Sequence, residues 1–132
     1  MSTLLISYQA NDPLAQSFQH QLQEWADENW DFPTVKFHQQ RTKTSFTGWQ
    51  AMEQRRKFRQ EIKQVQQFLV IISRDTWQSE WVNWEIETAA KQDKWLYAAK
   101  LDIPYMIPIS LWEAHPQWIE PFDQQALSQG HI

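Results

Sequence analysis

The chain has 132 residues, which gives room for one domain with a substantial core, and we expect residues 1–132 to form a single unit. Its net charge of −4 argues against a nucleic-acid binder, because neutralising phosphates needs a concentrated positive face. The absence of cysteine excludes thiol nucleophiles, disulfides and thiolate metal sites. The start of the chain lacks a signal-peptide pattern and no apolar run reaches membrane-spanning length, so a soluble protein in the cytoplasm is expected.

The first predicted strand covers residues 4–8, and a helix is predicted to follow it. Asp12 and Pro13 supply the cap and the first-turn proline of that helix. Its apolar residues recur every three or four positions and form one stripe, which indicates packing on a sheet. They are Leu14, Phe18, Leu22 and Trp25. A brief second strand is predicted at residues 35–37.

A polar segment, residues 38–48, leads from the second strand into a second helix. The apolar residues of this helix are Met52, Phe58, Ile62 and Val65. The third predicted strand, residues 68–73, is a continuous apolar and β-branched run. Such a run is typical of a strand that is covered on both faces.

The third helix is predicted to carry Trp81, with an inner face made by Val82, Ile86 and Ala89. Residues 95–101 are predicted to form the fourth strand, and residues 106–109 the fifth. The prolines at positions 104 and 108 suit an edge strand, where a missing backbone donor is tolerated. A short closing helix is predicted from Trp118 to Leu127.

Five short strands that alternate with helices predict a flavodoxin-like, three-layer α/β sandwich with a five-stranded parallel sheet. Ligands of such sheets bind at the carboxyl ends of the strands, where the following helices begin. Glu85 lies in the helix after the third strand, among Trp77, Trp81 and Trp84. We expect its carboxylate to lie in a pocket and to have no role in the core. The alternative is a solvated glutamate whose aromatic neighbours are core residues.

Several reaction classes lack their motifs in this chain. The only glycines are Gly48 and Gly130, so neither a dinucleotide-binding glycine fingerprint nor a phosphate-binding P-loop can be present. The four histidines are far apart, and none has a metal-ligand spacing, so no metal site is expected. No G-x-S-x-G sequence is present, which excludes the usual serine hydrolase of an α/β sheet.

A single acid beside aromatic surface suits the cleavage of an N-glycosidic bond. One nearby negative charge can stabilise the ribosyl oxocarbenium ion that develops, while tryptophan and tyrosine faces stack on flat bases. Nicotinamide is a good neutral leaving group in NAD, so no strong general acid is needed. NAD would be a substrate, and no cofactor is required.

Three segments resemble the TIR and TIR-like domains, most closely the bacterial branch of the Thoeris-type antiphage systems. They are residues 5–8, residues 68–76 and residues 79–86. The last segment holds a W-x-x-x-E element, in which the resemblance assigns the catalytic glutamate to Glu85 and not to Glu87. The resemblance implies an NAD glycohydrolase or ADP-ribosyl cyclase that makes ADP-ribose or a cyclic isomer as a signal in antiphage defence. It also implies self-association through TIR–TIR contacts and a phage-derived trigger.

Six further residues are candidates for substrate binding. Tyr8, Trp77 and Trp81 would supply stacking surface, and Ser7, Gln9 and Ser73 would supply hydrogen bonds from strand ends. For each of them the alternative is a core aromatic or a polar group that caps a strand end.

Two further alternatives stay open. The protein could be a non-catalytic interaction domain that acts by self-assembly or by binding a signal nucleotide. The basic cluster Arg55, Arg56, Lys57 and Arg59 could hold phosphates, but charge runs on helices are usually solvated faces, and we expect this one to face solvent or a partner.

Overall fold

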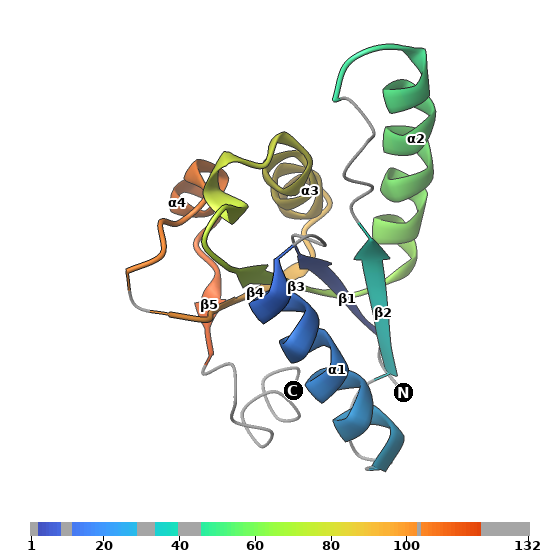
Figure 1. The fold of residues 1–132 in the computed structure, drawn as a ribbon. Helices are drawn as coiled ribbons and strands as arrows, with labels where there is room; N and C mark the ends of the chain where they lie inside the picture. Colours follow the sequence, from blue (N-terminus) through green and yellow to red (C-terminus); the bar gives the residue numbers. More distant parts are fainter. Residues whose placement is uncertain (1–2, 9–11, 29–33, 40–45, 103, 120–132) are drawn as a thin grey trace.

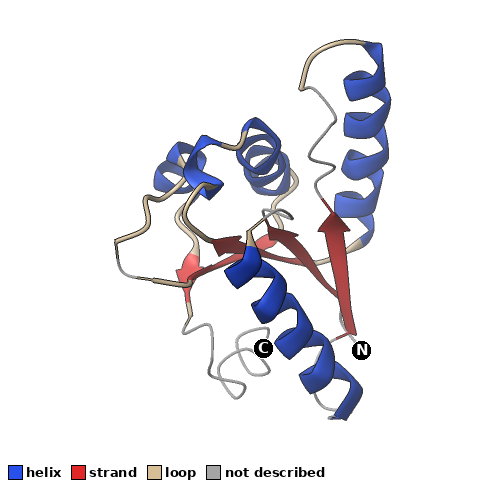
Figure 2. Cartoon of the chain, viewed as in Figure 1, coloured by secondary structure: helices blue, strands red, loops and turns tan. Residues whose placement is uncertain are grey.

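The computed structural model describes residues 3–8, 12–28, 34–39, 46–102 and 104–119. The described strands are β1 (Thr3–Tyr8), β2 (Thr34–Gln39), β3 (Gln67–Ile72), β4 (Trp95–Lys100) and β5 (Gln117–Trp118). The described helices are α1 (Pro13–Glu28), α2 (Trp49–Gln64), α3 (Glu80–Lys91) and α4 (Ile109–Ala114), with a 3₁₀ turn, η1 (Thr76–Gln78), between β3 and α3. Figure 2 shows how helices and strands alternate along the chain.

All five strands form one parallel sheet with the order β2-β1-β3-β4-β5. The chain passes outward from β1 to β2, and then returns across β1 to build the other half of the sheet. This is the strand order of flavodoxin-like folds, so the predicted fold class is confirmed. In such a sheet a crevice opens between β1 and β3, where the direction of winding changes.

Helices cover both faces of the sheet (Figure 1). On one face, α1 packs through Phe18 and Leu22 against side chains of β1, β3 and β4. On the other face, α3 packs through Val82, Ile86 and Ala89, as the sequence predicted. In Figure 1 α3 lies between α2 and α4 on this second face. The burial of both faces explains the unbroken apolar sequence of β3.

The alternation of side chains in β1 assigns each of its residues to one face. Leu4, Ile6 and Tyr8 belong to the core on the α1 side. Leu5 belongs to the core on the α3 side, and Ser7, two positions on, points to the same side. The two candidate residues at the end of β1 therefore face opposite layers.

The predicted fifth strand is wrong. Residues 106–108 precede α4, and Ile109 is its first residue, while the fifth strand is the two-residue β5 beside Tyr97 and Ala98. A short apolar run with proline fits the start of a helix as well as a strand, and here the Ser110 amide and hydroxyl bind Asn83 at the start of α4. Trp118, the expected start of a closing helix, lies in β5, and residues 120–127 lie outside the described residues.

Two predicted core residues are also wrong. Leu14 and Met52 are exposed, whereas their neighbours Ala15 and Ala51 are buried. Near the first turn of each helix, the buried position is thus one residue away from the predicted one. Spacing alone does not distinguish a small buried alanine from a large apolar neighbour at the end of a stripe.

Candidate functional site

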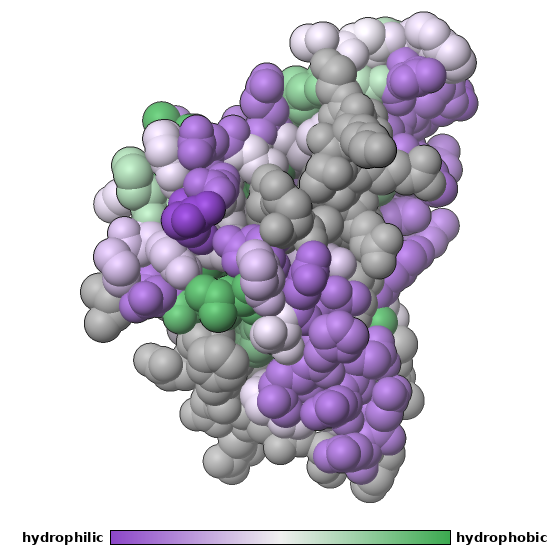
Figure 3. Space-filling view, in the orientation of Figure 1, coloured by the Kyte–Doolittle hydropathy of each residue, from purple (hydrophilic) through white to green (hydrophobic). Residues whose placement is uncertain are grey.

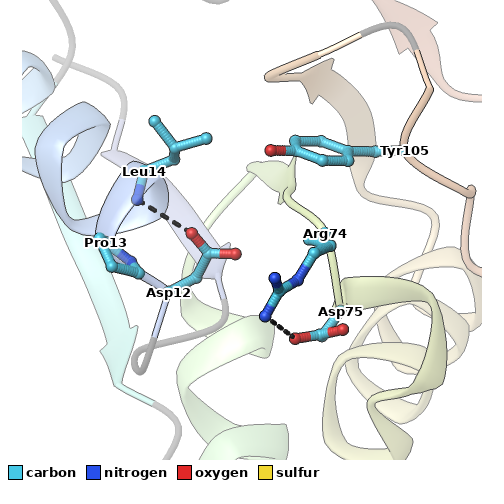
Figure 4. Close-up of a pocket in the computed structure, with 6 residues that line it drawn as sticks. All are labelled: Asp12, Pro13, Leu14, Arg74, Asp75 and Tyr105. Carbon is cyan, nitrogen blue, oxygen red and sulfur yellow. Dashed lines mark hydrogen bonds and ion pairs between the residues drawn. The ribbon is translucent and has the colours of Figure 1, made fainter.

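A pocket lies at the carboxyl edge of the sheet, where the strand order changes direction. Its volume is about 380 Å³. Asp12, Pro13 and Leu14 line it from the start of α1, Arg74 and Asp75 from the segment after β3, and Tyr105 from the segment after β4. Figure 4 shows the Arg74 side chain between Asp12 and Asp75, with the Tyr105 ring across the pocket.

The polar groups of this pocket are held by local contacts. The Asp12 carboxylate accepts a 2.9 Å hydrogen bond from the Leu14 amide and so caps α1. The Arg74 guanidinium donates to the Asp75 carboxylate at 3.4 Å, and both side chains are solvated. The pocket thus presents one cation, two carboxylates and a phenol, a set that suits a small polar ligand with hydroxyl groups.

The turn from β3 into α3 is built by side-chain hydroxyls. The Ser73 amide donates to Thr76 Oγ1 at 2.8 Å, and the two hydroxyls lie 3.0 Å apart in a buried position. Ser79 then caps α3, because its Oγ accepts from the Val82 amide at 3.1 Å. Ser73, a candidate for substrate binding, is therefore a turn-forming residue here.

Glu85 lies in the second turn of α3 and its side chain has 0% exposure. The expectation that it has no role in the core is wrong. It shares one side of the helix with Trp81 and Thr88, next to the side that packs on the sheet. Burying a carboxylate to this degree requires polar partners, because an unpaired buried charge is costly. Glu87 in the same helix is exposed and has no such requirement.

An aromatic cluster joins α2 to α3 immediately before Glu85. The Trp81 ring makes edge-to-face contacts with three other rings, at centroid distances of 5.2, 5.8 and 6.3 Å. These rings belong to Phe46, Phe58 and Trp84. Trp81 is therefore a packed residue with little exposed ring surface, and in this conformation it offers no open face for stacking.

Two residues of the basic cluster also contact these rings. The Arg55 guanidinium lies 4.7 Å from the Phe46 ring centre and 6.0 Å from that of Trp81, and it donates to the Phe46 carbonyl at 2.6 Å. Arg59 lies 5.7 Å from the Trp84 ring centre. Arg56 and Lys57 are exposed, as expected for a solvated face. The expectation fails for Arg55, which is partly buried against α3.

Ser7 is the candidate that shares a face of the sheet with Glu85. Its hydroxyl is buried, and it has no hydrogen-bond partner among the described residues. Tyr8 lies on the opposite face, where its hydroxyl donates to Gln19 Oε1 at 3.0 Å in α1. The strand thus separates two residues that the sequence analysis grouped together.

The remaining candidates are less closely placed. Trp77 lies in η1 and is exposed, and Gln9 lies outside the described residues. The structure therefore brings Ser7, Trp81 and Glu85 to the same side of the sheet.

The residues that line this pocket were not among the functional candidates predicted from the sequence. Asp12 was assigned only a capping role, and Arg74 and Asp75 directly follow a predicted strand, a position at which ligands are often bound. The position of Arg74 and Asp75 at a strand end could therefore have marked them as candidates. Tyr105 carried no signal, because only the sheet brings the segment after β4 beside the segment after β1.

Among the described residues, no group of three or more His, Cys, Asp or Glu side chains is arranged to hold a metal ion. None of the described helices is both long enough and apolar enough to span a membrane.

The fold and the W-x-x-x-E element on α3 are those of a TIR-like domain. Residues 5–103 match the sequence model of the family described as "Thoeris protein ThsB, TIR-like domain". The chain belongs to this family.

Among solved structures, the chain is similar to the TIR domains in the structure of the activated Roq1 resistosome directly recognizing the pathogen effector XopQ. The TM-score is 0.49 and the sequence identity 11%. The likeness covers 76% of this chain and 57% of that one, so the chain spans less than two thirds of that protein chain. No curated protein matches the sequence.

Proposed function

We propose that this protein cleaves NAD, releasing nicotinamide and forming ADP-ribose or a cyclic ADP-ribose isomer that acts as a signal in antiphage defence. Glu85 is the catalytic residue of this proposal. Its negative charge stabilises the ribosyl cation as the bond to nicotinamide breaks. Self-association and a phage-derived trigger belong to the same proposal.

The observation that carries the proposal is the enclosed carboxylate of Glu85 within the W-x-x-x-E element of α3. The side chain has 0% exposure, whereas Glu87 two positions on is exposed. A charge acts more strongly on a developing cation where water is excluded than at a solvated surface. The buried Ser7 hydroxyl on the same side of the sheet gives the proposal a further polar group for a ribose hydroxyl.

The enclosure of Glu85 has a consequence for the reaction. A substrate reaches the carboxylate only if side chains around Trp81 move, because that ring and Glu85 are both buried. The proposal therefore requires an opening step before chemistry, which is common where a site excludes water. Tyr8 is not part of the proposed site in this conformation, since its ring packs against α1.

The test is the release of free nicotinamide from NAD by the purified chain, measured by chromatography over time. Glu85→Gln keeps the size of the side chain and removes its charge, and it should lower the rate about a hundred- to thousandfold. Glu87→Gln is the matched control in the same helix and should keep the full rate. Full activity of folded Glu85→Gln protein would refute the assignment of Glu85.

A non-catalytic interaction domain is the second candidate. It is favoured by the large apolar side chains that the domain exposes, among them Trp49, Ile109 and Trp112. The same assay separates the two functions, because an interaction domain releases no nicotinamide at any protein concentration.

A further inference from the structure

The pocket at the carboxyl edge of the sheet is separate from the proposed catalytic residue. Among the described residues that line it there is neither Glu85 nor Trp81. Its lining comes from three segments that meet only in the folded chain, namely residues 12–14, residues 74–75 and Tyr105. The pocket lies where the strand order changes direction, the usual place for a ligand in such a sheet. We call it the switch-point pocket.

One oxygen of the Asp12 carboxylate is available to a ligand. The other oxygen, Oδ1, accepts the hydrogen bond from the Leu14 amide at 2.9 Å. In Figure 4 the second oxygen points away from Leu14, toward the side of the pocket that holds Arg74. An ionised carboxylate can only accept hydrogen bonds, so this oxygen calls for a donor on the ligand.

Arg74 supplies hydrogen-bond donors beside this acceptor. A guanidinium group carries five N–H groups. Its Nη2 donates to Asp75 at a long 3.4 Å, and the Arg74 side chain is 77% exposed. Most of its donors are therefore available to acceptor atoms of a ligand.

The charges of the pocket favour a neutral ligand. The lining has two carboxylates, Asp12 and Asp75, and one guanidinium, Arg74, which lies between them (Figure 4). The carboxylates repel an anion, and a cation competes with Arg74 for them. A hydroxyl group both donates and accepts, so two adjacent hydroxyls can bind Asp12 and Arg74 together.

The rest of the lining suits a flat ring of moderate size. The Tyr105 ring lies across the pocket from Leu14 (Figure 4), and it is held by packing against the core on the α3 side. The surface around the start of α1 is mixed, because hydrophilic residues predominate along this helix while a hydrophobic patch lies beside its first turn (Figure 3). The volume of about 380 Å³ is near the lower end of the range for small-molecule sites. A nucleoside fits such a volume better than a dinucleotide does.

We propose that the switch-point pocket binds a neutral ribonucleoside. The vicinal diol of the ribose bonds to Asp12 and Arg74, and the base lies against the Tyr105 ring. This inference goes beyond the proposed function and does not rest on it, because it concerns a second site. Through Asp75 the ligand contacts the start of η1, which leads into the helix of Glu85.

The test is a titration of isotope-labelled protein with adenosine, followed by the amide resonances in two-dimensional NMR spectra. Adenosine should shift the amides of Leu14 and residues 74–78 in a saturable manner. 2′-Deoxyadenosine lacks one hydroxyl of the diol and should bind at least about tenfold more weakly, because a polar group of the pocket then loses its partner. Methyl β-D-ribofuranoside has the diol but no base, and it should also bind more weakly than adenosine.

Two variants each remove one partner of the diol. Asp12→Ser keeps a cap for α1 but lacks the second oxygen, and Arg74→Gln changes an exposed side chain, so both should keep the wild-type urea midpoint. Each should weaken adenosine binding at least about tenfold. Glu24→Ser is the matched control and should bind as the wild type does, since Glu24 is exposed in the second half of α1, outside the pocket. If Asp12→Ser has a lowered midpoint, Arg74→Gln decides alone.

Glu85→Gln shows whether adenosine uses the proposed catalytic site instead. This variant should bind adenosine as the wild type does, and a loss of binding would overturn the second site. Because no turnover is measured, failure of this proposal and failure of the proposed enzyme are distinguishable.

Three further results overturn the proposal. They are the absence of saturable shifts up to the solubility limit of adenosine, equal binding of adenosine and 2′-deoxyadenosine, and unchanged binding by the folded Asp12→Ser and Arg74→Gln variants. Equal binding of adenosine and methyl β-D-ribofuranoside would refute the contact between the base and Tyr105.

Discussion

Asn83 joins three segments around the start of α3. Its amide nitrogen donates to the Trp77 and Ser79 carbonyls at 3.3 and 3.0 Å, and its oxygen accepts both bonds from Ser110. One side chain thus ties η1 and α4 to the helix of Glu85. Asn83 therefore acts on Glu85 through the position of α3.

Asn83→Ala should lower the free energy of unfolding by about 2 kcal/mol, because the buried Ser110 and two backbone carbonyls lose their partner. Urea denaturation measures the change. An unchanged midpoint for Asn83→Ala would show that these bonds contribute no net stability.

Tyr97 makes the fold sensitive to alkaline pH. Burial raises the pKa of the Tyr97 phenol above its ordinary value, because the charged phenolate is poorly solvated there. The native state therefore keeps this proton to higher pH than the unfolded chain does. Its contribution is present in full below about pH 10 and is lost as pH rises above that value.

The check is a comparison of wild type with Tyr97→Phe in urea denaturation between about pH 8 and about pH 11. The midpoint of wild type should fall more steeply above about pH 10 than that of the variant. Equal slopes in the two proteins would show that another group causes the alkaline loss. The absolute stability of Tyr97→Phe at neutral pH does not enter the comparison.

Helix α2 has two kinds of basic residue, although they are adjacent in sequence. Arg55 contacts Phe46 and Trp81, whereas Arg56 is exposed and paired with Glu53 at 2.8 Å. A solvated pair in one helix contributes little to stability, but an arginine over two rings with a bond to a carbonyl contributes more.

Arg55→Gln should therefore cost about 1–2 kcal/mol of unfolding free energy, and the matched Arg56→Gln less than about 0.5 kcal/mol. Thermal or urea denaturation measures both. Replacing Arg56 and Lys57 with Ser should leave the KM for NAD nearly unchanged, since both face away from α3. A clear KM increase in the folded double variant would instead assign phosphate binding to this face.

The assembled state should control the activity of the domain. Because Glu85 is enclosed in the single chain and both flanks of α3 contact helices that expose apolar surface, we expect slow turnover by dilute protein. Specific activity should rise with concentration or with an added trigger, as mass action requires of a site that association opens.

Nicotinamide release per mole of protein over about a hundredfold dilution series tests this expectation. A flat, high specific activity would mean that the site opens within one chain.

The order of elements through β4 could be predicted from local pattern. Strands that are covered on both faces are continuous apolar runs, and the helix stripes recur at three and four residues, so β1, β3, β4 and α1 to α3 were all identified. β5 could not be predicted, because it has only two residues and follows shortly after His115, which has a left-handed backbone conformation. So short a strand has no sequence pattern of its own. The W-x-x-x-E element and the strand before it identified the family, and they make Glu85 the candidate catalytic residue.

Which side chains meet was decided by strand order and register. The alternation of β1 puts Ser7 and Tyr8 on opposite faces, the sheet brings Tyr105 beside Asp12 and Arg74, and α2 lays Arg55 against Trp81. These contacts join segments far apart in the chain, and no local pattern encodes them. A local pattern reports what one segment must bury, but the partner that buries it is set by the packing of the other segments.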